Sequence, residues 1–449
     1  MGINIHHIRK DLFSYTSKQV SIAPLASFRI LFGALLVFST LRFMSRGWVD
    51  DLYVKPLFYF TYSGFEWIHP LSRTGMYIVF CGMAIAALCI TLGLLYRIAT
   101  LLFFLCFTYV ELLDKTNYLN HYYFVSIISL FLVLLPAHKY ASLDTKLGIT
   151  TPANHVPAWC IHVIKLQIGM VYVFAGIAKI NYDWLIHAQP LKIWLAGRDH
   201  LPFIGYFFHY TMVPYLFSWF GMLFDLTIVF FLLYKKTRTL AYLLVIIFHL
   251  TTAYLFQIGV FPYVMIAATW IFFSEDFHLK ILQLFSSKNS TSPSSYYPFM
   301  PRLVYCFFLI HFTIQLLLPF RYLLYPGKLF WTEQGYRFSW RVMLLEKNGY
   351  AAFIVKDKNG KLYEVKKSNY LSAQQEKMMN TQPDMILQFA HYIAAEYKNM
   401  RIKDPEVYVD AYVSVNGRRS QPFIDPNVNL VKQEDNFSNK KWILPLLDK

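Results

Sequence analysis

Charged side chains are scarce in this sequence. Only 15% of its 449 residues are Asp, Glu, Lys or Arg, whereas 56% are hydrophobic and 19% are aromatic. A soluble protein of this length needs far more charge on its surface, so the composition excludes an ordinary soluble fold and indicates a membrane protein. Membrane lipid is therefore the predicted partner of much of the chain.

Cysteines are few, and a cleavable signal peptide is missing. A cysteine inside an apolar segment acts as a small hydrophobic residue, so we predict neither a disulfide nor a zinc site, and no metal. All five cysteines lie in such segments: Cys81, Cys89, Cys106, Cys160 and Cys306. The first residues, MGINIHHIRKDLFSYTSKQVSIA, lack a compact apolar core. We expect residues 1–23 to form an N-terminal cytosolic segment.

Several functional motifs are absent as well. The net charge is +16, but the basic residues are dispersed and form no stripe or DNA-reading motif, which argues against nucleic acid as a partner. The sequence contains no Gly-rich phosphate loop, no HExxH and no nucleophile elbow. Anionic lipid headgroups are the predicted counter-charge.

Long apolar segments are what the sequence does have. They predict a polytopic α-helical membrane protein with about nine transmembrane helices, most of them near the ~20 residues that a bilayer requires. The third and the eighth are short, and the stretch 201–217 reads as an interfacial or re-entrant piece. The predicted spans are 24–44, 76–96, 98–113, 119–137, 158–180, 217–234, 239–256, 258–274 and 303–320.

Loop charge predicts the orientation of this bundle, residues 24–324. With the N-terminus inside, the inner loops carry twelve lysines and arginines and the outer loops carry seven. The segment 325–449 would then lie outside. Its hairpin signals at Asn359-Gly360 and Asn416-Gly417, with a helix pattern over 383–400, predict a small extracytosolic α+β domain. A Ser-rich inner loop is expected at 286–298.

Lys179 ends the fifth predicted span, in AGIAKINYDW. One interpretation is an anchor whose ammonium reaches the headgroups, and the other is a functional group, because an ionisable residue in a span is expected to face the interior and to pair. Asn120 and His121 begin the fourth span at a similar depth, and His249 lies in the seventh. Burial favours the neutral amine, which is a usable base.

Packing alone also accounts for each of these residues. A single histidine in a span is often a satisfied packing residue, so His249 on its own decides nothing. Asp225 in the sixth span could pair with a basic neighbour or mark the site, and we favour structural pairing. The convergence of several polar groups on one outer half of the bundle is what favours a site.

Ordered motifs along essentially the whole chain resemble the vitamin K-dependent gamma-glutamyl carboxylase family. The lysine-bearing block is the most specific of them. The motifs are PLASFRILFG, LLDKTNYLNHYYF, HVPAWCIHVIKLQIGMVYVFAGIAKINYDWL, FHLTTAYLFQIGVFPYVM, WTEQGYRFSWRVML, VYVDAYVSVNGRRSQPFIDPNVNL and WILPLLD.

The resemblance implies roles for individual residues. Lys179 matches the base that deprotonates vitamin K hydroquinone, and His121 matches a histidine that stabilises a reaction intermediate. The cofactor-binding residues implied by the match are Asn120, His249, Phe261 and Met265. The segment around Tyr336 and Trp340 resembles the region that handles the glutamate substrate. Molecular oxygen and carbon dioxide are the implied co-substrates.

Two departures from the family pattern stand out. The cysteines that animal members pair between the first outer loop and the soluble domain fall on Phe60 and Tyr392, so packing is expected to hold this domain. The chain also ends soon after WILPLLD, where animal members continue. The resemblance therefore suggests a short, bacterial form, and it does not carry over propeptide-directed, processive carboxylation.

Taken together, the residues and the resemblance predict a membrane-integral carboxylase. It would couple epoxidation of vitamin K hydroquinone to carboxylation of glutamates in an exported protein or peptide. The expected location is the bacterial inner membrane, or the endoplasmic reticulum membrane in a eukaryote. Two alternatives stay open: a quinol epoxidase that lacks carboxylation, and a non-catalytic transporter or scaffold.

Overall fold

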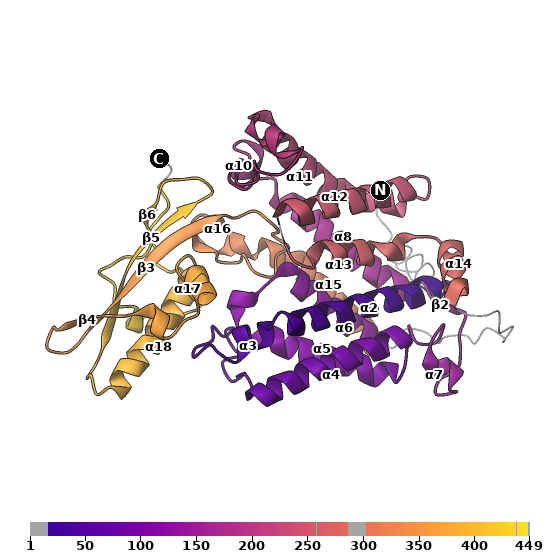
Figure 1. Cartoon of the computed structure of the whole chain (residues 1–449), viewed down its shortest axis with the longest axis horizontal. Helices are drawn as coiled ribbons and strands as arrows, with labels where there is room; N and C mark the ends of the chain where they lie inside the picture. The colour runs from indigo at the N-terminus through magenta and orange to yellow at the C-terminus, as the bar shows by residue number, and fades with distance from the viewer. Residues whose placement is uncertain (1–16, 257, 286–301, 437, 448–449) are drawn as a thin grey trace, which may run out of the picture.

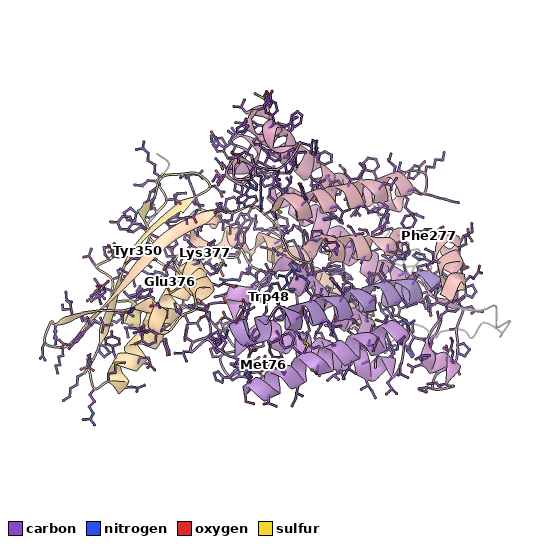
Figure 2. The ribbon with its side chains drawn as sticks, in the orientation of Figure 1. Trp48, Met76, Phe277, Tyr350, Glu376 and Lys377 are labelled. Atoms are coloured by element: carbon purple, nitrogen blue, oxygen red, sulfur yellow. The ribbon has the colours of Figure 1, made fainter. Side chains whose placement is uncertain are left out.

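The computed structural model describes residues 17–256, 258–285, 302–436 and 438–447. Most of the predicted N-terminal segment 1–23 and the whole Ser-rich loop 286–298 lie outside the described residues. A helical bundle makes up most of the structure, and a sheet domain formed by the C-terminal part of the chain packs against one end of it (Figure 1). Phe277 of α14 (Glu275–Phe285) lies at the opposite end (Figure 2).

Seven helices of the described residues are long and apolar enough to cross a membrane. The shorter apolar helices α6 (Asn120–Leu134) and α13 (Phe261–Thr269), extended by η3 (Trp270–Phe272), fall on the fourth and eighth predicted spans. The third predicted span was expected to be short, but the helix found there, Tyr96–Leu113, is long enough to cross a membrane. The count of nine stays a prediction. The seven are α2 (Ala23–Ser45), α4 (Arg73–Leu92), α5 (Tyr96–Leu113), α8 (Trp159–Ala178), α11 (Met212–Leu233), α12 (Arg238–Phe256) and α15 (Arg302–Leu317) with η4 (Leu318–Leu324).

The stretch 201–217 was predicted to be an interfacial or re-entrant piece, and the structure agrees with this only in part. It contains the short turn η2 (Gly205–His209), but α11 already begins at Met212, five residues before the predicted start. Pro214 is tolerated there because the first four N–H groups of a helix have no intrahelical acceptor. Short helices connect the spans: α3 (Trp48–Tyr53), α7 (Leu143–Lys146), α9 (Tyr182–Leu185), α10 (Leu191–Ala196), α16 (Leu329–Thr332) and the turn η1 (Lys115–Asn117).

The C-terminal part forms the predicted α+β structure. Its antiparallel sheet has the strand order β4–β3–β5–β6, and both predicted hairpins and the predicted helix are confirmed. Gly360 and Gly417 supply the left-handed backbone that these turns require. The elements are β3 (Lys347–Lys356), β4 (Leu362–Glu364), β5 (Glu406–Val415), β6 (Gln421–Pro422), α17 (Ala373–Met379) and α18 (Pro383–Asn399), with β1 (Gln19–Ser21) and β2 (His155–Pro157) paired elsewhere.

Aromatic side chains pack near the two positions, Phe60 and Tyr392, that the resemblance matches to paired cysteines. Phe60, from the loop between α3 and α4, is fully buried in the core of the C-terminal domain. Its neighbour Phe58 lies with its ring centroid 4.4 Å from that of Tyr392 and 5.9 Å from that of Phe389, both on α18. The prediction that packing holds the domain agrees with these contacts.

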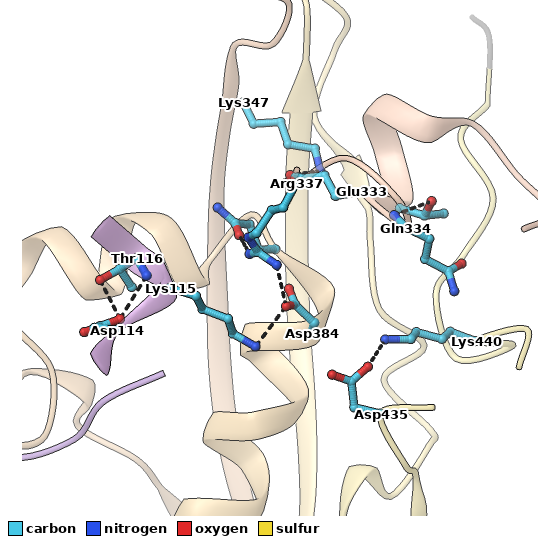
Figure 3. A network of polar contacts seen from close by, with 12 residues as sticks. Asp114, Lys115, Thr116, Glu333, Gln334, Arg337, Lys347, Asp384, Asp435 and Lys440 are labelled. Atoms are coloured by element: carbon cyan, nitrogen blue, oxygen red, sulfur yellow. Dashed lines mark hydrogen bonds and ion pairs between the residues drawn. The ribbon is translucent and has the colours of Figure 1, made fainter. Parts of the chain in front are cut away.

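A network of charged side chains, buried or largely buried, joins the bundle to the C-terminal domain (Figure 3). Asp384 at the start of α18 lies 2.9 Å from the Lys115 ammonium of the α5–α6 loop and 2.8 Å from Arg337. Asp114 accepts a hydrogen bond of 2.8 Å from Gln375 of α17. Burial opposes the charged carboxylate, but Arg337 and Lys115 outweigh it and hold the pKa of Asp384 well below its usual range.

Asp384→Asn is expected to loosen the domain by about 3 kcal/mol, because it leaves the buried Lys115 and the largely buried Arg337 without their carboxylate. Because folding lowers the pKa of Asp384, the carboxylate contributes fully to stability above its unfolded pKa of about 3.9. That contribution to stability is lost only as pH falls below this value. Limited proteolysis of the C-terminal domain should therefore be faster in the variant and independent of pH between about 5 and 8 in the parent. Equal proteolysis of parent and variant would contradict this role.

Candidate active site

Lys179 follows the last turn of α8 and is buried, with 5% of its surface exposed. Its Nζ lies 2.7 Å from Oδ2 of Asp225 on α11 and 5.4 Å from the centre of the Trp184 ring. The amine is therefore paired inside the protein rather than extended to headgroups. This is the pairing expected of an ionisable residue in a membrane span.

Close approach of two helices makes this ion pair possible. A β-carbon at Gly176 of α8 would lie 2.7 Å from Cγ of Leu226, so only glycine lets α11 come this near. Asp225 precedes Leu226 and is thereby brought opposite the last turn of α8. The helix contact sets the distance between carboxylate and amine.

A small apolar cavity surrounds the ion pair. Its volume is about 70 Å³. It brings together four of the residues that the sequence singled out, namely Lys179, His249, Phe261 and Met265. Its other walls are mostly apolar and aromatic, so an ionic group there interacts strongly with its neighbours. These walls include Tyr172, Ala175, Trp184, Phe217, Phe248 and Met343.

His249 is held in this wall by Tyr172, whose hydroxyl lies 2.8 Å from Nε2. Nδ1 of the same ring is buried and has no hydrogen-bond partner among the described residues. A buried polar atom without a partner costs free energy that a bound ligand can recover. His249 is therefore a candidate ligand contact.

His121 and Asn120 do not line the cavity. The Phe261 ring, which does line it, has its centre 5.7 Å from that of His121 and 5.7 Å from that of His249. Asn120 accepts a hydrogen bond from Tyr118 and donates one of 2.9 Å to the carbonyl of Arg341. In this structure Asn120 therefore fixes the segment that contains Arg341.

Tyr336 and Trp340, expected from the sequence in the region that handles glutamate, line neither of the two cavities. Trp340 is fully buried, stacks on Tyr123 at 4.9 Å and donates to Gln315 at 3.1 Å. Tyr336 lies near Phe330, with ring centres 6.4 Å apart, and lines none of the cavities described here. Neighbours of Trp340 in the chain, rather than Trp340 itself, face the cavities.

The segment 338–343 contributes to the walls of both the small cavity and a second, larger one of about 1010 Å³. Ser339 and Arg341 line the large cavity, whereas Val342 and Met343 line the small one. The backbone at Phe338, Trp340 and Met343 is left-handed, with φ of 60°, 57° and 57°. Such conformations are strained in bulky residues and often accompany functional sites.

Asp225 pairs with a basic neighbour, as the sequence favoured, but the sequence did not identify Lys179 as that neighbour. An acidic residue in an apolar helix was the available signal, but the partner depends on how α8 and α11 are aligned. Tyr172 and Trp184 had no signal beyond their aromatic side chains. Among the described residues, no group of three His, Cys, Asp or Glu side chains could hold a metal ion.

The fold and the site define a polytopic helical membrane protein with a buried amine and carboxylate in an apolar cavity, capped by an α+β domain. Residues 17–277 match the HTTM domain, and residues 300–449 match the lumenal domain of vitamin K-dependent gamma-carboxylase. No solved structure matches the chain. The chain belongs to the vitamin K-dependent gamma-carboxylase family, as its motifs predicted.

Proposed function

We propose that this protein is a membrane-integral gamma-glutamyl carboxylase that couples epoxidation of vitamin K hydroquinone to carboxylation of glutamate side chains. The observation that carries the proposal is the buried Lys179–Asp225 pair in an apolar cavity, with a large cavity whose wall shares chain segments with it. The apolar lining of the first cavity suits a quinol, and the volume of the second suits a peptide. Family membership supports the same assignment.

The residues of the small cavity fit the head group of a quinol. Phe261, Met265 and Trp184 offer apolar surface, and the unpartnered Nδ1 of His249 offers a hydrogen bond to a ring oxygen. A two-ring head group is larger than about 70 Å³, so side chains in this wall must move on binding. Once bound, the quinol supplies the oxygen chemistry that generates a base strong enough to remove a glutamate γ-proton.

Lys179 and Asp225 together can take a proton from a quinol hydroxyl. The ion pair and the neutral pair differ only in the position of one proton along the 2.7 Å contact. A proton that moves from Lys179 to Asp225 leaves a neutral amine, which is a competent base. Asp225 thereby acts as the proton acceptor that allows a paired lysine to work. His121, whose ring neighbours Phe261 of the cavity wall, is proposed to stabilise charge on a reaction intermediate.

Burial protects this chemistry. Water reaches a strong base less easily in a cavity inside the bundle, which limits its loss by protonation. The proposed location is the bacterial inner membrane, with the N-terminus in the cytosol and the C-terminal domain outside. The glutamate substrate would then belong to an exported protein or peptide.

Product analysis tests the proposal. Purified protein in lipid nanodiscs would receive reduced vitamin K, oxygen, bicarbonate and a glutamate-containing peptide. We expect vitamin K epoxide and γ-carboxyglutamate to form together, as measured by chromatography and peptide mass spectrometry. A protein that makes neither product would contradict the proposal.

A quinol epoxidase without carboxylation is the second candidate. The burial of Trp340, which was expected to handle glutamate, favours it. The same assay distinguishes the two functions, because this candidate yields epoxide with no γ-carboxyglutamate.

A further inference from the structure

The large cavity lies where the bundle meets the C-terminal domain. Its volume of about 1010 Å³ is ample for a peptide segment. The outer end of α8 forms one wall, through Phe174, Ile177 and Ala178, and the β5–β6 turn at Asn416 and Gly417 forms another. The ligand inferred for this cavity rests on the proposed function.

The charged groups of the cavity are mainly basic. Lys192, Lys328, Arg341 and Arg418 line it, and the acidic residue in its wall is Asp183. Asp183 is already neutralised, because Arg418 contacts both of its oxygens, at 2.6 and 2.9 Å. The cavity therefore attracts an anionic ligand.

Arg341 differs from the other basic residues in its surroundings. Only 8% of its surface is exposed, and it has no carboxylate partner among the described residues. Its Nε is buried without a hydrogen-bond partner. A buried guanidinium without a counter-ion is unfavourable, and a ligand carboxylate would relieve that cost.

The guanidinium is also held in place. It lies 4.5 Å from the centre of the Tyr322 ring, and Nη2 donates a long hydrogen bond of 3.4 Å to the carbonyl of Pro319. Asn120 donates a hydrogen bond to the backbone carbonyl of Arg341 and so fixes the backbone at that residue. The side chain is thus oriented in advance, which reduces the entropy lost when a ligand binds.

We propose that Arg341 binds the side-chain carboxylate of the glutamate substrate and selects glutamate over glutamine. Arg341 faces the large cavity, while Val342 and Met343, directly after it in the chain, line the small cavity that contains Lys179. A carboxylate held at Arg341 places the adjacent γ-carbon next to the wall between the two cavities. The planar guanidinium matches a carboxylate through two hydrogen bonds, which a glutamine amide cannot accept in the same way.

A binding measurement without quinol tests this role. The probe is a fluorescein-labelled peptide of neutral residues around two adjacent glutamates, and its control is the same peptide with two glutamines. By fluorescence anisotropy in nanodiscs, we expect the parent to prefer the glutamate peptide. Arg341→Gln should weaken that binding about 10- to 100-fold and remove the preference. Arg73→Gln, on the exposed pair with Asp50, is the matched control and should bind like the parent.

The outcomes separate the inference from the proposed function. An Arg341→Gln protein that keeps the preference of the parent overturns the inference. If that variant does not fold, Arg341→Lys is the deciding variant, because it retains the positive charge but loses the planar guanidinium. An unchanged affinity of Arg341→Lys for the glutamate peptide would likewise overturn the inference. A parent that binds the glutamate peptide but forms no γ-carboxyglutamate contradicts the proposed function and leaves the role of Arg341 intact.

Discussion

Lys179→Ala should abolish both half-reactions, vitamin K epoxide formation and glutamate carboxylation. The variant removes the amine that takes the quinol proton, and general-base catalysis contributes about 100- to 10,000-fold. Because the strong base depends on the oxygenated quinol, carboxylation should fall by at least as much as epoxidation. Parallel measurement of epoxide by chromatography and of carboxylated peptide by mass spectrometry checks both.

Lys55→Ala is the matched control for this experiment. Lys55 forms an ion pair with Asp51 on the exposed surface and lines no described cavity, so its loss should leave both rates within about twofold. A Lys179→Ala protein that made epoxide at the rate of the parent, without an added amine, would show that another group starts the reaction.

Asp225→Leu should be severely destabilising, and a second substitution should reverse much of that effect. The single variant leaves the Lys179 ammonium buried without its carboxylate, which costs about 3–5 kcal/mol, whereas replacing both partners by apolar residues is often neutral. We therefore expect a large fall in the apparent melting temperature for Asp225→Leu and recovery in Lys179→Met/Asp225→Leu. The recovered double variant should remain inactive.

This pair of variants separates stability from catalysis. If the pair served only packing, the stable double variant would keep its epoxidase activity. Such a result would remove Lys179 and Asp225 from the chemistry. Additive losses of stability in the double variant would instead show that the two side chains do not interact.

The spans and the domain elements were readable from local patterns. Long apolar windows match the seven long helices and the two shorter ones, and the Asn-Gly turns match both hairpins. These signals are local, because a helix or hairpin depends on residues near one another in the chain. The start of α11 was missed because the prolines and histidine in 201–217 were taken to indicate an interfacial or re-entrant piece.

The site was only partly predictable, because its contacts join distant segments. Lys179 and Asp225 lie 46 residues apart, and their contact depends on the close approach of two helices at Gly176. The segment around Trp340 was expected to handle glutamate, and its three left-handed residues, Phe338, Trp340 and Met343, have no signal in the sequence. No periodic pattern in the sequence carries that information.

Deprotonation of bound quinol is the most direct test of the central claim, that the Lys179–Asp225 pair takes the first proton. Reduced vitamin K would be bound to purified protein at neutral pH without oxygen, and its ultraviolet absorption would report the fraction of quinol anion. We predict a substantial anion fraction in the parent and none above the free quinol in Lys179→Ala. Equal anion fractions in the two proteins would contradict the account.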